Sequence, residues 1–177
     1  MDLSFRHDLW WALLPRSPRD GGRVELCVVR PAPGERRLVD VLEVAPGCGA
    51  AGDHWHADAD RSLGAELALI NAHVARAVAR DRDHPGHTGD NLHVDLDLSE
   101  ANLPVGSQLA IGAALLEVSA DVHRPCASFH ARFGRLGAQR VARANRRGLR
   151  GRGLLCHVRR AGAIHLGAPI QVVRRGP

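Results

Sequence analysis

Hydrophobic and polar positions alternate in several short segments of the chain, as in strands that bury one face. Residues 24–30 and 37–44 read VELCVVR and RLVDVLEV, and the turn-forming PAPGER between them predicts a hairpin. Alternation returns in LHVDLDL at 92–98 and in AALLEVSADV at 113–122. Near the end of the sequence, LLCHVRRAG, AIHLGAP and IQVVRR are three further β-like segments separated by glycines.

Helical spacing is clearest over residues 63–80, which we expect to form one long helix on the outside of the fold. Alanine fills the gaps between its apolar positions, which are Leu67, Ile70, Val74 and Val78. A second, shorter helix is predicted near 126–133, and the stretch between the two helices is rich in turn residues.

These elements predict a mainly β fold, a β-barrel with helical insertions. The 177 residues are enough for one domain with a substantial core, and no repeat or long linker divides them. We therefore expect a single domain over residues 1–177.

The charge of the chain limits its chemistry. All 24 basic residues are arginines and the net charge is +5. Without lysine, a pyridoxal phosphate Schiff base is excluded. Aromatic residues make up only 3% of the chain, which leaves little on which bases could stack, so we expect no nucleic-acid partner.

No apolar run is long enough to span a membrane, so no membrane partner is expected. The first 18 residues contain two aspartates and lack a small-residue cleavage site, which argues against a signal peptide. A cytoplasmic location is the resulting expectation.

Four cysteines without a CxxC pair do not indicate a disulfide scaffold. Cys27 and Cys156 lie in apolar β-like runs and are expected to be buried, whereas Cys48 lies in a glycine-rich loop. Cys126, in RPCASF, follows a proline that favours the first turn of a helix, where an anion is stabilised. Arg124 and His123 add positive charge, so Cys126 is either a reactive thiolate or a packed core residue.

Two further groups of residues could carry chemistry. His54 and His56, in GDHWH, could join Cys126 and His130 in a zinc site, which would make the protein a zinc-binding protein or a hydrolase. The arginines between Arg140 and Arg152 form either a solvated face, a pocket for a phosphate or carboxylate, or a basic module that binds nucleic acid or a protein partner.

In this order, the motifs resemble those of the MOSC domain, the family named after the C-terminal domain of molybdenum cofactor sulfurase. The resemblance is strongest over residues 37–175. It rests on GAAGDHW at 49–55, the long block at 89–119 that begins GDNLHVDLDL, HRPCASFHARFG at 123–134, and LRGRGLLCHVRRAGAIHLGAPIQVV at 149–173.

The resemblance implies a β-barrel that binds a molybdenum-pterin cofactor or carries sulfur for one, with reduction of N-oxygenated substrates as a further activity. Cys126 matches the family's cysteine, so it is expected to be the catalytic residue and the metal ligand or sulfur carrier. The positions expected to bind the cofactor are Asp53, His54, Asn91, Arg124, Arg147, Arg150 and Arg152. Expected partners are a small-molecule substrate and a redox or sulfur-donor protein.

Overall fold

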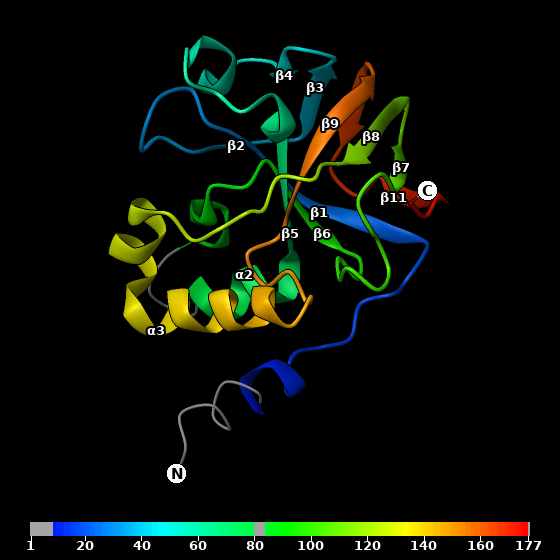
Figure 1. Ribbon diagram of the computed structural model, residues 1–177. Helices are drawn as coiled ribbons and strands as arrows, with labels where there is room; N and C mark the ends of the chain where they lie inside the picture. Colours follow the sequence, from blue (N-terminus) through cyan, green and yellow to red (C-terminus); the bar gives the residue numbers. More distant parts are fainter. Residues whose placement is uncertain (1–8, 80–83, 177) are drawn as a thin grey trace.

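The computed structural model describes residues 9–79 and 84–176, and its main feature is a closed barrel (Figure 1). Residues 1–8, part of the segment from which the absence of a signal peptide was predicted, lie outside this description. The barrel strands are β1 (Gly22–Val29), β5 (Leu67–Asn71), β6 (Leu92–Asp95), β7 (Gln108–Ile111), β8 (Ala114–Val118), β9 (Leu154–Arg160) and β11 (Pro169–Arg174).

The strands follow the order β11-β7-β8-β9-β5-β6-β1, and β1 pairs with β11 to close the circle. Closure leaves no barrel strand with an unpaired edge. All neighbours are antiparallel except β5 and β6, which are parallel with Leu69 opposite Leu92. A parallel pair needs a crossover connection, and here it contains helix α2 (Ala72–Ala79). The predicted β-barrel with helical insertions is confirmed.

Four short strands complete the β structure on one side of the barrel. Strand β2 (Arg37–Val39) pairs with β1, while β3 (Val41–Ala45), β4 (Gly49–Ala50) and β10 (Gly162–His165) form a separate sheet of order β10-β3-β4. The predicted strand at 37–44 is therefore split between two sheets at Asp40. Three 3-10 turns, η1 (His54–Ala57), η2 (Leu63–Ala65) and η3 (Pro85–Thr88), connect the strands.

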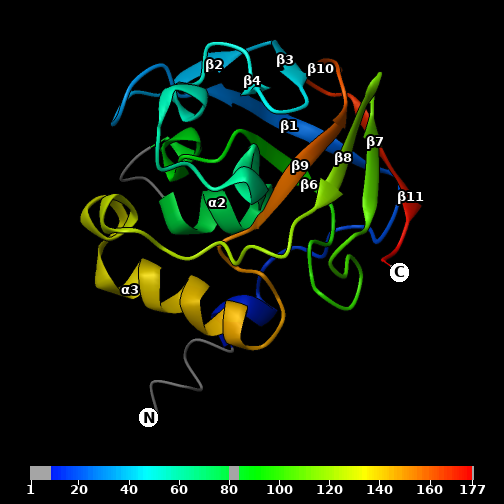
Figure 2. The ribbon, with the colours of Figure 1, turned by 45° about the horizontal axis from the view of Figure 1, so that its top comes forward.

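Helices α2 and α3 (Ala127–Arg146) lie together on the side of the barrel away from β3 and β4 (Figure 2). Their apolar faces form a second core with Ile70, in which Phe129 and Phe133 pack against α2. Trp10 and Trp11 of the N-terminal segment add to it. Among the described residues, no helix has both the length and the hydrophobicity to cross a membrane.

The predicted long helix at 63–80 is wrong in its first half. Residues 67–71 form the buried central strand β5, and the helix starts only at Ala72, while Arg80 lies outside the described residues. The second helix is longer than predicted, because α3 extends to Arg146. It bends at Gly134, whose φ of 71° and ψ of 173° interrupt the helical backbone.

Candidate functional site

Cys126 is the N-cap residue of α3 and is exposed. Its backbone carbonyl accepts the hydrogen bond from His130 N at 3.0 Å, the first bond of the helix. Its thiol makes no capping hydrogen bond, so the sulfur is available to another partner. The helix therefore begins one residue later than predicted, with Pro125 just before the cap.

A cavity of about 580 Å³ opens beside Cys126, in the size range of ligand and cofactor sites, about 300–1,000 Å³. It lies where the β1–β2 loop, η3, the start of α3 and the turn before β9 come together. The chain that links β8 to α3 also contributes to it. Its lining residues are Arg30, Gly34, Arg36, His87, Thr88, Gly89, His123, Cys126, Ser128, Phe129, Ala131, Arg132 and Arg152. We call this space the Cys126 cavity.

One wall of the Cys126 cavity is held by a buried ion pair. Arg152 Nη1 lies 2.7 Å from both carboxylate oxygens of Asp90, and Arg152 Nη2 donates to the carbonyl of Thr88 at 2.9 Å. The guanidinium carbon is 4.8 Å from the centre of the Phe129 ring. Burial, the largest single effect, would raise the pKa of Asp90, but the charge and hydrogen bonds of Arg152, together with the neighbouring His123 and His93, outweigh it and the pKa is lowered.

His123 lies beside this ion pair, with its Nδ1 3.5 Å from Asp90 Oδ1. Burial and the charge of Arg152 lower the pKa of His123 to about 3, against the opposite effect of Asp90. Its ring is therefore neutral near pH 7, contrary to the positive charge that the sequence suggested. Its Nδ1 is buried without a hydrogen-bond partner.

Asp53, His54 and Asn91 do not line the Cys126 cavity, but they are linked to Arg30, which lines it. Asp53 accepts two side-chain hydrogen bonds from Arg30, at 2.8 and 3.1 Å, and one from Asn91 Nδ2 at 2.8 Å. His54 Nδ1 is 2.7 Å from the Arg30 carbonyl. Burial would raise the pKa of Asp53, but the hydrogen bonds and charge of Arg30 lower it overall. These three residues therefore position Arg30 in the cavity wall.

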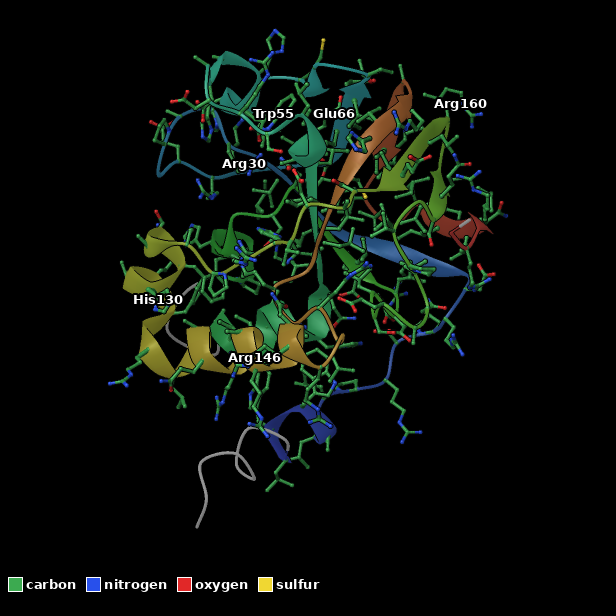
Figure 3. The ribbon with its side chains drawn as sticks, in the orientation of Figure 1. Arg30, Trp55, Glu66, His130, Arg146 and Arg160 are labelled. Atoms are coloured by element: carbon green, nitrogen blue, oxygen red, sulfur yellow. The ribbon has the colours of Figure 1, made fainter. Side chains whose placement is uncertain are left out.

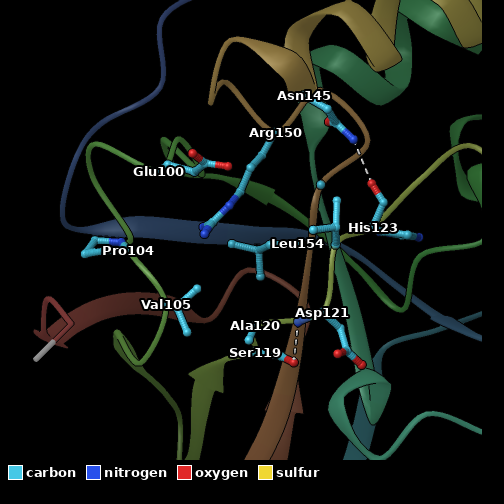
Figure 4. Close-up of a pocket in the computed structure, with 12 residues that line it drawn as sticks. Glu100, Pro104, Val105, Ser119, Ala120, Asp121, His123, Asn145, Arg150 and Leu154 are labelled. Atoms are coloured by element: carbon cyan, nitrogen blue, oxygen red, sulfur yellow. Dashed lines mark hydrogen bonds between the residues drawn. The ribbon is translucent and has the colours of Figure 1, made fainter.

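Of the four arginines expected to bind cofactor, only Arg152 reaches the Cys126 cavity. Arg124 is exposed and is not among the lining residues, and Arg147 ends α3 as its C-cap. Arg150 lines a different cavity of about 330 Å³, near Glu100 and Asn145 (Figure 4). Its Nη1 donates to the carbonyls of Leu98 and Leu103, so it holds the loop after β6.

The zinc site expected from His54, His56, Cys126 and His130 is not formed. Across residues 9–79 and 84–176, no three His, Cys, Asp or Glu side chains are grouped so that they could hold a metal ion. The two histidines of η1 flank Trp55, which lies far from His130 on α3 (Figure 3). The histidine spacing of GDHWH reflects a short 3-10 turn rather than an extended strand.

The family model of the MOSC domain matches residues 62–171. The chain belongs to the MOSC domain family. The family is associated with proteins related to the molybdenum cofactor, which agrees with the sequence resemblance.

Solved structures show the same fold as this MOSC domain. The YuaD protein from Bacillus subtilis superposes with a TM-score of 0.63 and 20% identity, covering 84% of this chain and 93% of its own. YiiM from Escherichia coli has a TM-score of 0.59 and 24% identity, with 86% and 70% covered. YiiM from Geobacillus stearothermophilus has 0.57 and 17%, with 92% and 77% covered. No curated protein matches significantly.

Three arginines of the Cys126 cavity were not singled out from the sequence of this MOSC domain. Arg30 and Arg36 bracket the turn of the first hairpin, and Arg132 lies in α3. A pair of arginines at the ends of one turn is a visible signal, but only the folded hairpin shows that the turn faces α3. Arg132 lies six residues after Cys126, within two helical turns of the cap.

The thiols divide as the sequence predicts. Cys27 and Cys156 are buried, whereas Cys48 and Cys126 are exposed. Burial raises the pKa of Cys27 to about 11 and that of Cys156 to about 12, so both stay protonated. Cys48 lines a separate, open pocket with Glu43, and the described residues that line this pocket include no arginine.

Proposed function

We propose that this MOSC domain binds a molybdenum-pterin cofactor, or carries sulfur for metal–sulfur cofactor chemistry, through Cys126. The observation that carries the proposal is the exposed thiol of Cys126 at a cavity lined by Arg30, Arg36, Arg132 and Arg152. A soft thiolate is a suitable ligand for a metal–sulfur centre, and guanidinium groups suit a phosphorylated ligand.

The buried polar atoms of the cavity fit such a ligand. Arg36 Nε, Arg152 Nε and His123 Nδ1 are buried without a hydrogen-bond partner, although each belongs to a residue that lines the cavity. Buried polar groups are nearly always paired in folded proteins, so unpaired ones around one cavity are consistent with partners supplied by a ligand. Phe129 offers an apolar face beside them.

Each part of the chain then has its own role. Cys126 would ligate the metal, and the cavity arginines would balance the negative charge of the cofactor. The Asp90–Arg152 pair would keep one wall of the Cys126 cavity rigid, and the neutral His123 would lie beside this pair. When bound, the cofactor would supply a molybdenum centre that exchanges electrons with a substrate, for which N-oxygenated compounds are the proposed class.

In the sulfur-carrier form of the proposal, Cys126 takes sulfur from a persulfide donor. The Cys126 thiolate attacks the outer sulfur of the donor, the donor's S–S bond breaks, and the donor leaves as a thiolate. A new S–S bond at Cys126 makes it a persulfide, without any net oxidant. A redox protein or a sulfur-donor protein is the proposed partner.

Elemental analysis for Mo, W, Zn and Fe tests the proposal on protein made in a host that synthesises the molybdenum cofactor. Molybdenum or tungsten should copurify with the wild-type protein and with Cys48→Ser, and be lost from Cys126→Ser. For sulfur transfer, mass spectrometry should find one added sulfur on Cys126 after incubation with a persulfide donor. The proposal is refuted if no molybdenum or tungsten copurifies and no sulfur is added to Cys126.

A further inference from the structure

A second cavity, of about 330 Å³, shares a wall with the Cys126 cavity (Figure 4). His123 lines both cavities. Asn145 lines the second one, where its Nδ2 donates to the carbonyl of His123 at 2.7 Å and its Oδ1 accepts from the backbone N–H of Arg152 at 3.0 Å. A ligand in this second space, which we call the Arg150 cavity, would therefore contact residues that join the two sites.

The backbone of Arg150 is strained where it enters this cavity. Its φ of 47° is the only positive φ of a non-glycine residue in the described part of the chain. A residue with a Cβ atom keeps such a conformation only where its surroundings hold it. Here the carbonyl of Arg150 accepts a hydrogen bond from Gly153 N at 2.7 Å, and the side chain extends toward Pro104 and Val105 (Figure 4). The strained turn thus places a guanidinium group in the cavity.

The protein satisfies this guanidinium group only in part. Arg150 Nη1 donates to the carbonyls of Leu98 and Leu103, at 3.3 and 2.6 Å. Its Nε and Nη2 have no acceptor among the described residues and are not fully buried, so they can reach a ligand. Burial lowers the pKa of Arg150, against the opposite effect of the negative charge of Glu100. A ligand carboxylate fits this position, because it can accept two parallel hydrogen bonds from one guanidinium group.

Two carboxylates and an apolar surface also line the Arg150 cavity. Glu100 and Asp121 are both exposed there, and the carboxylate of Glu100 accepts no hydrogen bond from a described residue. Val105 and Val122 line the same space with 47% and 62% of their surface exposed. Covering exposed valines with an apolar group is favourable. The cavity therefore offers a ligand one cation, two anions and an apolar surface.

We infer that the Arg150 cavity binds a small zwitterionic amino acid with an apolar side chain. The carboxylate of the ligand pairs with Arg150, and its ammonium group pairs with Glu100. Its side chain packs against Val105 and Val122. A simple anion would face two carboxylates, and a simple cation would face a half-buried guanidinium group, so a ligand with both charges fits best. This site does not involve Cys126 and does not rest on the proposed function.

Three ligands with the same branched carbon skeleton test the inference by isothermal titration calorimetry, on the purified protein at about pH 7 and low ionic strength. Leucine carries both charges, isocaproate lacks the ammonium group, and isoamylamine lacks the carboxylate. The wild-type protein should bind leucine about tenfold or more tightly than either relative. The inference is overturned if leucine does not bind, or if isocaproate or isoamylamine binds as tightly.

Variants locate the binding in the Arg150 cavity. Glu100→Gln should weaken leucine binding about threefold or more without weakening isocaproate binding, because the partner of the ammonium group alone is lost. Glu43→Gln, which removes an exposed carboxylate beside Cys48, is the matched control and should bind leucine as the wild type does.

Arg150→Gln should weaken the binding of leucine and isocaproate but not that of isoamylamine. Because Arg150 also holds the loop after β6, circular dichroism checks the fold of each variant, and Glu100→Gln decides the question if Arg150→Gln does not fold. Leucine binding that is unchanged in Glu100→Gln overturns the inference.

Discussion

Arg152 Nη1 bridges both carboxylate oxygens of Asp90 at 2.7 Å, and both side chains are buried. The pair joins the short link between η3 and β6, which contains Asp90, to the turn that precedes β9, which contains Arg152. Arg152 also contacts Thr88 and the Phe129 ring, so three segments that line the Cys126 cavity meet at one guanidinium group. We expect the shape of the cavity to depend on this pair.

Asp90→Asn should lower the free energy of unfolding by about 3–5 kcal/mol, because it leaves the buried guanidinium of Arg152 without its counter-charge. Urea denaturation followed by circular dichroism measures the change. Glu117→Gln is the matched control, since Glu117 pairs with the exposed Arg159 at 2.7 Å, and it should cost less than about 1 kcal/mol. Similar losses in the two variants would contradict a special role for the buried pair.

The two exposed thiols should differ in their preference for charged reagents. The arginines of the Cys126 cavity attract an anion, whereas Cys48 shares its pocket with Glu43. We therefore expect the ratio of the iodoacetate rate to the iodoacetamide rate to be higher at Cys126 than at Cys48. Cys126 should also be labelled first.

Peptide mass spectrometry at timed intervals reads out this prediction, and the buried Cys27 and Cys156 should stay unlabelled in the folded protein. High salt is the control, because it screens the arginines and should reduce the difference. If Cys48 shows the greater preference for iodoacetate, the electrostatic argument for Cys126 is wrong.

Acidification should destabilise the fold through His93. This side chain is buried, and burial is the main reason that its pKa falls from 6.5 to about 4. The unfolded chain takes up a proton near pH 6.5 but the folded chain only near pH 4, so stability is lost as the pH falls between these values. At about pH 5.5 the loss from His93 is about 1 kcal/mol.

Urea denaturation at several pH values tests this expectation. His93→Gln should flatten the dependence of unfolding free energy on pH in this window, while His56→Gln, at an exposed position, should leave it unchanged. An unchanged slope in His93→Gln would show that other groups cause the acid sensitivity.

The sequence predicted the barrel because alternation is a local signal, which β8 displays with alternately buried and partly buried residues. It mistook residues 67–71 for helix because Leu67, Ile70 and Val74 recur at helical spacing. Four consecutive residues of β5 are buried, since the strand lies at the centre of the barrel wall with α2 and α3 outside it. Such a strand shows no alternation, and its alanine-rich continuation favours helix.

The site was predicted less completely than the fold. Pro125 and the helical sequence after it correctly placed Cys126 at the start of a helix. The contribution of Arg36 could not be predicted in this way, because it depends on contact between the first hairpin and the η3 turn at Gly89, far apart in sequence. The arginine-rich stretch was conspicuous in the sequence, yet Arg152 is the only one of the expected arginines that lines the Cys126 cavity.

The pairing of β1 with β11, Gly22 opposite Ile170, also affects how the protein is made. Strand β1 is synthesised first and its partner follows every other barrel strand, so during translation β1 must wait with one edge unpaired. Contacts between segments so distant in sequence form slowly, and open edges invite pairing with other chains. Newly made chains should therefore be most prone to aggregation just before β11 emerges, and a circular permutant that joins β11 directly to β1 should fold faster.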